Sequence, residues 1–224
     1  MTDGIRAMET RRCSGPNGDP GAPEAGRGPI AAVVLAAGRS SRMGRPKLLL
    51  PLGGRAVIAR VIDAVLASTA APVAIVAGAE IERLRQALQG RTLTWVLNPD
   101  PAAAMLDSVR LGLQALPSHW QAVVIVLGDQ PGLDPETIDR LADKFAAGGR
   151  GIVVPVHKGR RGHPILVAAR HRDEILRSHD GLGLRGLLRA HPEDVQEIET
   201  DRPSVLEDMD TPSDYREWRE RLGR

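Results

Sequence analysis

The chain has 224 residues, of which 42% are hydrophobic and 26% charged, as expected for one soluble globular domain. No stretch approaches the roughly 18 apolar residues of a membrane-spanning helix, and the N-terminus lacks the apolar core of a signal peptide. The net charge is only +2 and aromatic residues make up 2%, so the basic and aromatic clusters of a nucleic-acid binder are missing. The single cysteine, Cys13, has no partner for a disulfide, which favours a cytoplasmic protein. We therefore expect neither a membrane nor a nucleic acid as partner.

Residues 1–29 are expected to form a disordered tail. Nine of the sixteen residues from Ser14 to Pro29 are glycine or proline, and no apolar periodicity is present. The pattern changes at Ile30, and residues 30–224 are expected to form one domain.

From Ile30 onward, short apolar runs alternate with amphipathic segments. The runs are typical of buried strands, and apolar residues at helical spacing predict the helices between them. In chain order we predict a strand at 30–35, a helix at 55–68, a strand at 73–77, a helix at 80–89, a strand at 94–97, a helix at 105–115, a strand at 122–127 and a helix at 135–147. Asp134 is the expected N-cap of the last helix, with Pro135 at its first position. This alternation predicts a single Rossmann-like three-layer α/β domain with a mostly parallel central sheet.

The alternation loosens after Gly149. Two strands are expected at 152–156 and 165–167, separated by the basic loop 158–163. Short helices follow, then a strand near 195–198 and a final helix that begins after Thr211 with Pro212 at its first position. No internal repeat and no second domain boundary is visible.

The loop after the first strand is the first place to look for a ligand, because doubly wound sheets bind ligands outside the carboxyl ends of their strands. It is small and basic, and its backbone N–H groups can form a nest for anions. Arg39, Arg42 and Lys47 add positive charge for phosphate groups, and Lys47 is one of only three lysines among thirty basic residues. The loop matches neither the P-loop nor the dinucleotide fingerprint. On charge alone, an ordinary turn with solvated arginines explains it equally well.

Two aspartate motifs offer oxygen ligands for Mg²⁺, which prefers carboxylates together with substrate phosphates. Asp129 follows the strand at 122–127 directly; the alternative is a turn aspartate that bonds its own backbone. Asp208 and Asp210 precede the last helix and, in an extended stretch, face the same side. Asp214 is expected only to cap that helix.

These motifs together carry a resemblance. The segment 35–47, L-A-A-G-R-S-S-R-M-G-R-P-K, resembles the signature of the MobA-like NTP transferase family, whose members mature the molybdenum cofactor. It is also similar to the opening of sugar-phosphate and methylerythritol-phosphate nucleotidyltransferases. The G-D-x-P motif at Asp129 and the D-x-D-T-P-x-D motif at 208–214 match as well, so the resemblance covers about residues 30–218. It implies the fold of the nucleotide-diphospho-sugar transferases.

The resemblance also implies an activity. A phosphate of the acceptor attacks the α-phosphorus of a nucleoside triphosphate and pyrophosphate leaves, with Mg²⁺ as cofactor. Arg42 and Lys47 would contact the triphosphate, and Asp129 and Asp210 would bind Mg²⁺. The catalytic residues implied are thus Lys47, Arg42 and Asp129. The nucleotide-binding residues implied are Leu35, Ala36, Ala37, Gly38, Arg39, Ser40, Arg42, Lys47, Asn98 and Ser108.

The substrates follow from finer features of the resemblance. The segment Leu35-Ala36-Ala37-Gly38 is similar to the cytidylyl branch, since the guanylyl branch has Leu-Ala-Gly-Gly there. CTP is therefore the expected donor and a molybdopterin-type cofactor the expected acceptor. Where the family has Gly-Met before the base-contacting serine, this chain has Ala104-Met105. Ser108 is therefore either a base contact or a helix serine that faces solvent.

Acceptor contacts are implied by two further motifs. Arg161-Gly162-His163-Pro164 is similar to the G-H-P motif of the cofactor cytidylyltransferases, and the segment ending at Arg185 also resembles that group. Arg161, His163 and Arg185 are the predicted acceptor-binding residues. The remaining histidines singled out, His119, His171, His179 and His191, are expected to be scattered over the surface. Trp95, Trp120 and Trp218 are expected to pack in the core.

Two groups of alternatives stay open. Within the enzyme class, the chain is a guanylyltransferase or transfers a nucleotide to a sugar or a small phospho-acid. In another class, it is a non-catalytic module that binds a nucleotide cofactor and delivers it to a client molybdoenzyme or its chaperone. Retention of both aspartate motifs favours catalysis, because binding alone needs fewer metal ligands.

Overall fold

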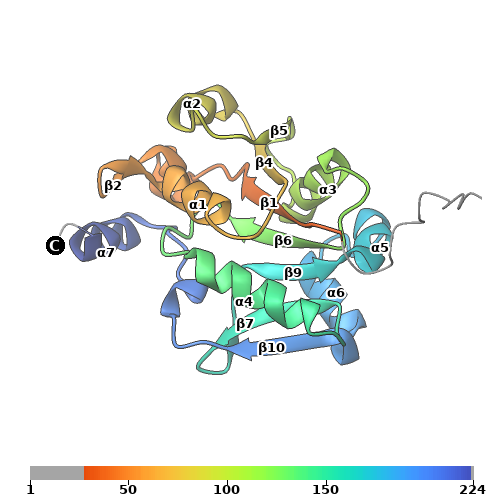
Figure 1. The fold of residues 1–224 in the computed structure, drawn as a ribbon. Helices are drawn as coiled ribbons and strands as arrows, with labels where there is room; N and C mark the ends of the chain where they lie inside the picture. Colours follow the sequence, from red (N-terminus) through yellow and green to blue (C-terminus); the bar gives the residue numbers. More distant parts are fainter. Residues whose placement is uncertain (1–27, 223–224) are drawn as a thin grey trace, which may run out of the picture.

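An eight-stranded sheet forms the centre of the computed structural model, which describes residues 28–222 (Figure 1). The strand order is β10-β7-β9-β6-β1-β4-β5, and β8 pairs with β7 beside this path. The strands are β1 (Ile30–Ala36), β4 (Val73–Ala77), β5 (Thr94–Leu97), β6 (Ala122–Leu127), β7 (Ile152–His157), β8 (Arg160–Arg161), β9 (Ile165–Ala168) and β10 (Val195–Glu199). Only β8 and β9 run antiparallel to their neighbours. The predicted mostly parallel sheet is therefore confirmed.

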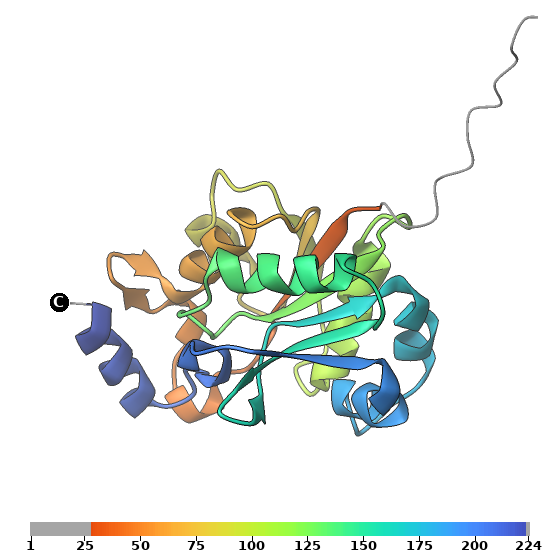
Figure 2. The same cartoon turned by 60° about the horizontal axis from the view of Figure 1, so that its bottom comes forward.

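Helices cover both faces of the sheet, as Figures 1 and 2 show. The helices α1 (Val57–Leu66), α2 (Ile81–Ala87), α4 (Pro135–Ala146) and α7 (Pro212–Leu222) contribute to one core. The helices α3 (Met105–Ala115), α5 (Arg172–Arg177) and α6 (Leu184–Ala190) contribute to the other. Successive side chains of a strand point to opposite faces, so Ala32 and Val34 enter the first core while Ala31 and Val33 enter the second. The chain thus has the predicted three layers.

The helix starts follow the predicted local chemistry. The Asp134 carboxylate accepts a hydrogen bond from the Thr137 N–H (2.8 Å), and Pro135 begins α4. At α7, the Asp214 carboxylate accepts from the N–H groups of Asp210 (2.9 Å) and Thr211 (2.7 Å). The predicted capping role of Asp214 is confirmed, and the cap also fixes the backbone at Asp210.

Two small hairpins were not predicted. The strands β2 (Pro51–Leu52) and β3 (Arg55–Ala56) pair antiparallel around a turn in which Gly53 and Gly54 have φ of 58° and 78°. This hairpin occupies the start of the helix predicted at 55–68, so α1 begins only at Val57. The second hairpin joins β7 to β8, inside the predicted basic loop 158–163.

Short 3₁₀ helices complete the chain. They are η1 (Ser41–Met43), η2 (Lys47–Leu49), η3 (Ala169–His171), η4 (Pro192–Asp194) and η5 (Pro203–Leu206). Trp120 and Trp218 are buried, as predicted. Within residues 28–222, no helix combines the length and apolarity needed to cross a membrane. The predicted tail lies outside the described residues except for Gly28 and Pro29, and Cys13 lies outside them too.

Candidate active site

The carboxyl ends of β1 and β6 lie side by side at one edge of the sheet. These strands pair in parallel, with Leu35 opposite Leu127, so the loop after β1 begins next to Asp129. The second acidic segment reaches the same place, because the Met209 N–H donates a hydrogen bond to the Asp129 carbonyl oxygen (2.9 Å). The fold therefore joins three segments that are distant in the sequence.

Lys47 is the centre of this junction. Its buried ammonium donates to the Asp129 carboxylate and to Oδ1 of Asp210 (2.6 Å). Arg42 donates from Nη1 to the other oxygen of Asp210 (2.5 Å). The predicted phosphate-binding cations and the predicted metal ligands thus form one ion-pair network.

The loop geometry directs Lys47 inward. Ser40 has a left-handed backbone conformation (φ 51°), and its hydroxyl oxygen accepts a hydrogen bond from the Lys47 N–H (3.1 Å). This bond closes the loop between residues 40 and 47, at the start of η2. Left-handed conformations of a residue other than glycine carry strain and are found at functional sites.

The charges of the network shift its pKa values. Burial alone would lower the pKa of Lys47, but the charges and hydrogen bonds of Asp129 and Asp210 outweigh it and raise this pKa. The hydrogen bond from Lys47 lowers the pKa of Asp210, and Arg42 adds to this effect. Burial raises the pKa of Asp208, and the negative charge of Asp129 raises it further.

A cavity of about 450 Å³ opens over the network. Every predicted nucleotide-binding residue lines it, as do Asp129, Asp208 and Asp210; the nucleotide-binding set is Leu35, Ala36, Ala37, Gly38, Arg39, Ser40, Arg42, Lys47, Asn98 and Ser108. A second cavity of about 730 Å³ shares the loop from Ala36 to Ser41 and extends past Gly78 to Leu97. The loop is thus a wall common to both cavities. Their volumes fall in the range of sites for small molecules.

Asn98 and Ser108 lie together in this cleft. Both side chains are buried, and the Asn98 amide donates to the Ser108 hydroxyl oxygen (2.9 Å). The alternative of a solvent-facing Ser108 is therefore wrong. Gly112, one turn further along α3, packs against the sheet, because a Cβ there would lie 2.4 Å from Cγ1 of Val33.

The acidic residues fit a divalent cation by their chemistry. The carboxylates of Asp129 and Asp210 converge on the single Lys47 ammonium, so both already face one cation. Both offer the hard oxygen ligands that Mg²⁺ and Mn²⁺ select. Asp208 is tied to Gln130, whose amide donates to its Oδ1 (2.7 Å). Sequence reasoning did not single out Gln130, although it directly follows Asp129 in the G-D-Q-P motif.

None of the three predicted acceptor residues is among the residues that line the first cavity. Arg161 lies on β8 and donates to the carboxylate of Glu197 on β10 (2.6 Å). Burial lowers the pKa of His163 to about 4; the Asp129 charge opposes this shift and the Arg185 charge adds to it. His163 is therefore neutral at pH 7, and the exposed Arg185 is the cation whose charge acts on its ring. The backbone of Gly162 lies close to the backbone of Val205, since a Cβ at Gly162 would lie 2.2 Å from the Val205 carbonyl oxygen.

The chain is similar to known proteins over most of its length. The family model described as MobA-like NTP transferase domain matches residues 32–195. A molybdenum cofactor cytidylyltransferase from Escherichia coli K12 is 28% identical over 86% of this chain and 96% of its own length. A nicotine blue oxidoreductase from Paenarthrobacter nicotinovorans is 30% identical over 81% of this chain and 92% of its own length.

Solved structures share the fold over most of the chain. The structure of Rv0371c from Mycobacterium tuberculosis H37Rv superposes with a TM-score of 0.75 and 30% identity, over 86% of this chain and 98% of that one. The same protein has been solved in complex with manganese. The chain also matches two bifunctional GlmU proteins, but it spans only about a quarter of their length.

Proposed function

The chain belongs to the MobA-like NTP transferase family, and we propose that it transfers CMP from CTP to the phosphate of a molybdopterin-type cofactor, with release of pyrophosphate. The observation that carries the proposal is the convergence of Lys47, Asp129 and Asp210 at the wall of the loop-lined cavity. We assign this activity to a domain spanning residues 30–224.

The chain's own residues have distinct tasks in this proposal. The loop from Ala36 to Arg42 holds the triphosphate with its backbone N–H groups and with the side chain of Arg42. Lys47 neutralises the charge that builds on the phosphates as the acceptor oxygen bonds to the α-phosphorus and the bond to pyrophosphate breaks. Because Asp129 and Asp210 outweigh the effect of burial on its pKa, the ammonium stays charged at neutral pH.

Asp129 and Asp210 would hold Mg²⁺, with Asp208 beside them as a third carboxylate. When bound, Mg²⁺ supplies positive charge that orients the phosphates and stabilises the leaving group. The manganese complex of Rv0371c supports a divalent cation in this fold. Asn98 and Ser108 would contact the base, and their mutual hydrogen bond fixes both side chains.

The substrates rest on the Ala36-Ala37 pair and on the name of the Escherichia coli relative. Arg185 is the proposed charge partner of the acceptor phosphate. His163, neutral at pH 7, would offer a hydrogen bond rather than a charge.

The test is a turnover assay with purified protein, Mg²⁺, molybdenum cofactor and each of CTP, GTP, ATP and UTP in turn. We expect pyrophosphate release and a cytidylylated product by mass spectrometry with CTP, at a rate that Asp129→Ala lowers by orders of magnitude. An unchanged rate in that variant would remove the metal assignment.

Other outcomes separate the alternatives. Turnover with GTP and not CTP would make the chain a guanylyltransferase. Binding of a nucleotide without turnover, across all four triphosphates, would favour the delivery module. Because one relative is named an oxidoreductase, a parallel arm follows NADPH oxidation, and activity there without pyrophosphate release would overturn the transferase.

A further inference from the structure

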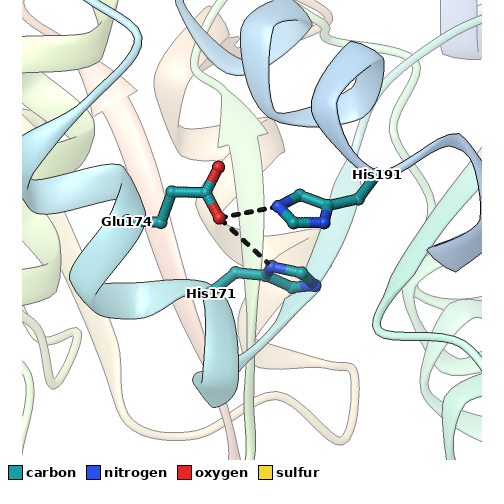
Figure 3. Close-up of side chains that lie close together, drawn as sticks. All are labelled: His171, Glu174 and His191. Carbon is teal, nitrogen blue, oxygen red and sulfur yellow. Dashed lines mark hydrogen bonds and ion pairs between the residues drawn. The ribbon is translucent and has the colours of Figure 1, made fainter.

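A group of histidines and carboxylates lies at the opposite edge of the sheet from the proposed active site. The strand β9 runs antiparallel to β6, so its end at Ala168 lies beside the first residue of β6, whereas Asp129 follows the last. His171 comes three residues after Ala168. Glu174 lies in the first turn of α5, and His191 follows α6 (Figure 3).

The expectation that His171, His179 and His191 are scattered surface residues is wrong. His171 is buried, and Nε2 of His191 lies 2.7 Å from Oε2 of the Glu174 carboxylate, which accepts the hydrogen bond. His179 bonds the other oxygen of the same carboxylate, at 2.7 Å. All three histidines therefore gather around Glu174.

The spacing of one atom from each of His171, Glu174 and His191 suits a single metal ion. These ligand atoms all lie within 4.8 Å of one another. Nδ1 of His171 is 4.0 Å from Oε2 of Glu174. Ligands of a tetrahedral ion with bonds of 2.0–2.2 Å lie about 3.3 Å apart, so small side-chain rotations would bring the three to that distance. Figure 3 shows both rings directed at the carboxylate.

The second ring nitrogen of His171 and that of His191 each face another carboxylate. Nε2 of His171 lies 2.6 Å from Oδ2 of Asp194. Asp194 is in turn fixed by the Gly151 N–H (2.7 Å) and by Arg170 (2.7 Å). Metal-bound histidines commonly donate their second ring N–H to a carboxylate in this way, which directs the other nitrogen at the ion. Nδ1 of His191 faces the carboxylate of Glu193 at 3.8 Å.

Nδ1 of His171 faces Oε2 of Glu174 at 4.0 Å, while Nε2 of the same ring faces Asp194. A metal ion between Nδ1 and the Glu174 carboxylate would bond to both. Two imidazoles and a carboxylate are a donor set suited to Zn²⁺ and its neighbours, and not to Mg²⁺.

We propose that His171, Glu174 and His191 bind one zinc-class divalent ion at a site separate from the nucleotide cavity. Asp194 orients His171, and His179 holds the Glu174 carboxylate in place. The ion would join the start of α5 to the segment between α6 and β10. Since it lies at the far edge of the sheet, it stabilises the fold rather than taking part in the transfer reaction.

The test uses the full chain without a histidine tag, stripped with a chelator and titrated with Zn²⁺ in excess Mg²⁺. We expect one Zn²⁺ per chain, and Co²⁺ in its place should give the visible absorption of a low-symmetry nitrogen and oxygen site. His191→Ala and the nearly isosteric Glu174→Gln should weaken zinc binding at least 100-fold, and Asp194→Asn by about 10- to 100-fold. The exposed His119→Gln is the matched control and should bind Zn²⁺ like the parent.

Two further readings complete the test. Zn²⁺ should raise the Tm of the parent and not that of Glu174→Gln, and Asp129→Ala should keep the zinc site. Zinc binding that survives in both His191→Ala and Glu174→Gln would overturn the proposal. So would the lack of saturable binding at micromolar Zn²⁺ in the parent, which would leave the cluster as a network of hydrogen bonds.

Discussion

At the scale of single residues, Lys47 combines an observed ion pair with a proposed contact to the phosphates. Its ammonium is attracted to the carboxylates of Asp129 and Asp210, which are also the proposed ligands of the metal. In the proposed reaction the same ammonium stabilises the phosphates. Removing it should therefore change metal binding and turnover in opposite directions.

We expect Lys47→Met to lower kcat by about 10²–10³, the usual loss when one group that stabilises transition-state charge is removed. The same variant should bind Mn²⁺ in the absence of nucleotide at least as tightly as the parent, because it leaves two carboxylates without their internal cation. Calorimetric titration and the pyrophosphate assay measure the two effects. Lys144→Met, on the exposed side of α4, is the control and should change neither. Weaker Mn²⁺ binding in Lys47→Met would mean that the lysine is needed to hold the acids in place.

The residues that the structure brings together at the candidate site each carry a local signal in the sequence. Asp129 directly follows a buried strand, and the loop around Arg42 and Lys47 matches a long motif. Their joining into one ion-pair network was not predictable, since it depends on bonds between segments far apart in the chain. The histidine cluster was missed for the same reason. The spacing of His171 and Glu174, three residues apart, was its only local signal, and His191 lies in another segment, directly after α6.

At the scale of elements, the patterns predicted α3, β4, β5 and β6 with the bounds that the structure has, because long apolar runs and helical spacing are strong signals. The two-residue strands β2 and β3 are too short to show an alternation of apolar and polar residues. The Gly53-Gly54 turn was their only signal in the sequence. The antiparallel entry of β9 between β6 and β7 depends on pairing between distant strands, which no local pattern encodes.

The packing of α3 on the sheet leads to a prediction at this scale. Gly112→Ala would place a methyl group 2.4 Å from Cγ1 of Val33, so α3 must shift away from β1. The gain in helix propensity is about 1 kcal/mol, whereas overpacking a core costs about 1–3 kcal/mol, so we expect a net loss of stability of up to about 2 kcal/mol. Because α3 also carries Ser108, KM for the nucleotide should rise.

Urea unfolding measures the stability, and a double-mutant cycle with Val33→Ala isolates the contact. The cycle should show a favourable coupling, since the smaller Val33 side chain makes room for the new methyl group. Gln114→Ala, on the exposed side of the same helix, should change stability by less than about 0.5 kcal/mol. A more stable Gly112→Ala would show that α3 does not press on Val33.

At the scale of the whole molecule, the two edges of one sheet carry two different chemistries. The carboxyl ends of β1 and β6 gather hard oxygen ligands and cations suited to phosphates, and the opposite edge gathers imidazoles. At the first of these edges, the segment from Gly162 to Pro164 precedes β9 and is held against η5 by the bond from the His163 N–H to the Val205 carbonyl oxygen (2.9 Å). The ionisable ring of His163 is half-buried there, so its protonation affects the stability of the fold.

His163 predicts how the stability of the whole chain depends on pH. Burial lowers the pKa of its ring from 6.5 to about 4 in the folded chain, so between these values the unfolded chain binds more protons. Stability therefore rises with pH across this window and falls as the pH drops from 6.5 toward 4. At 1.36 kcal/mol per pKa unit, the loss between pH 7 and pH 5 is about 2 kcal/mol.

Urea unfolding of the parent and of His163→Asn at pH 7, 6 and 5 tests this dependence. The free energy of unfolding of the parent should fall more steeply than that of the variant, and the difference between their slopes should account for about 2 kcal/mol by pH 5. The acids with lowered pKa values, Asp194 at about 2 among them, stay ionised throughout this range and lose their stabilising effect only below about pH 4. These acids therefore do not contribute to the change in stability between pH 7 and pH 5 that is assigned to His163. The exposed His119→Asn should keep the slope of the parent. Equal slopes for the parent and His163→Asn would show that the His163 ring is protonated in the folded chain.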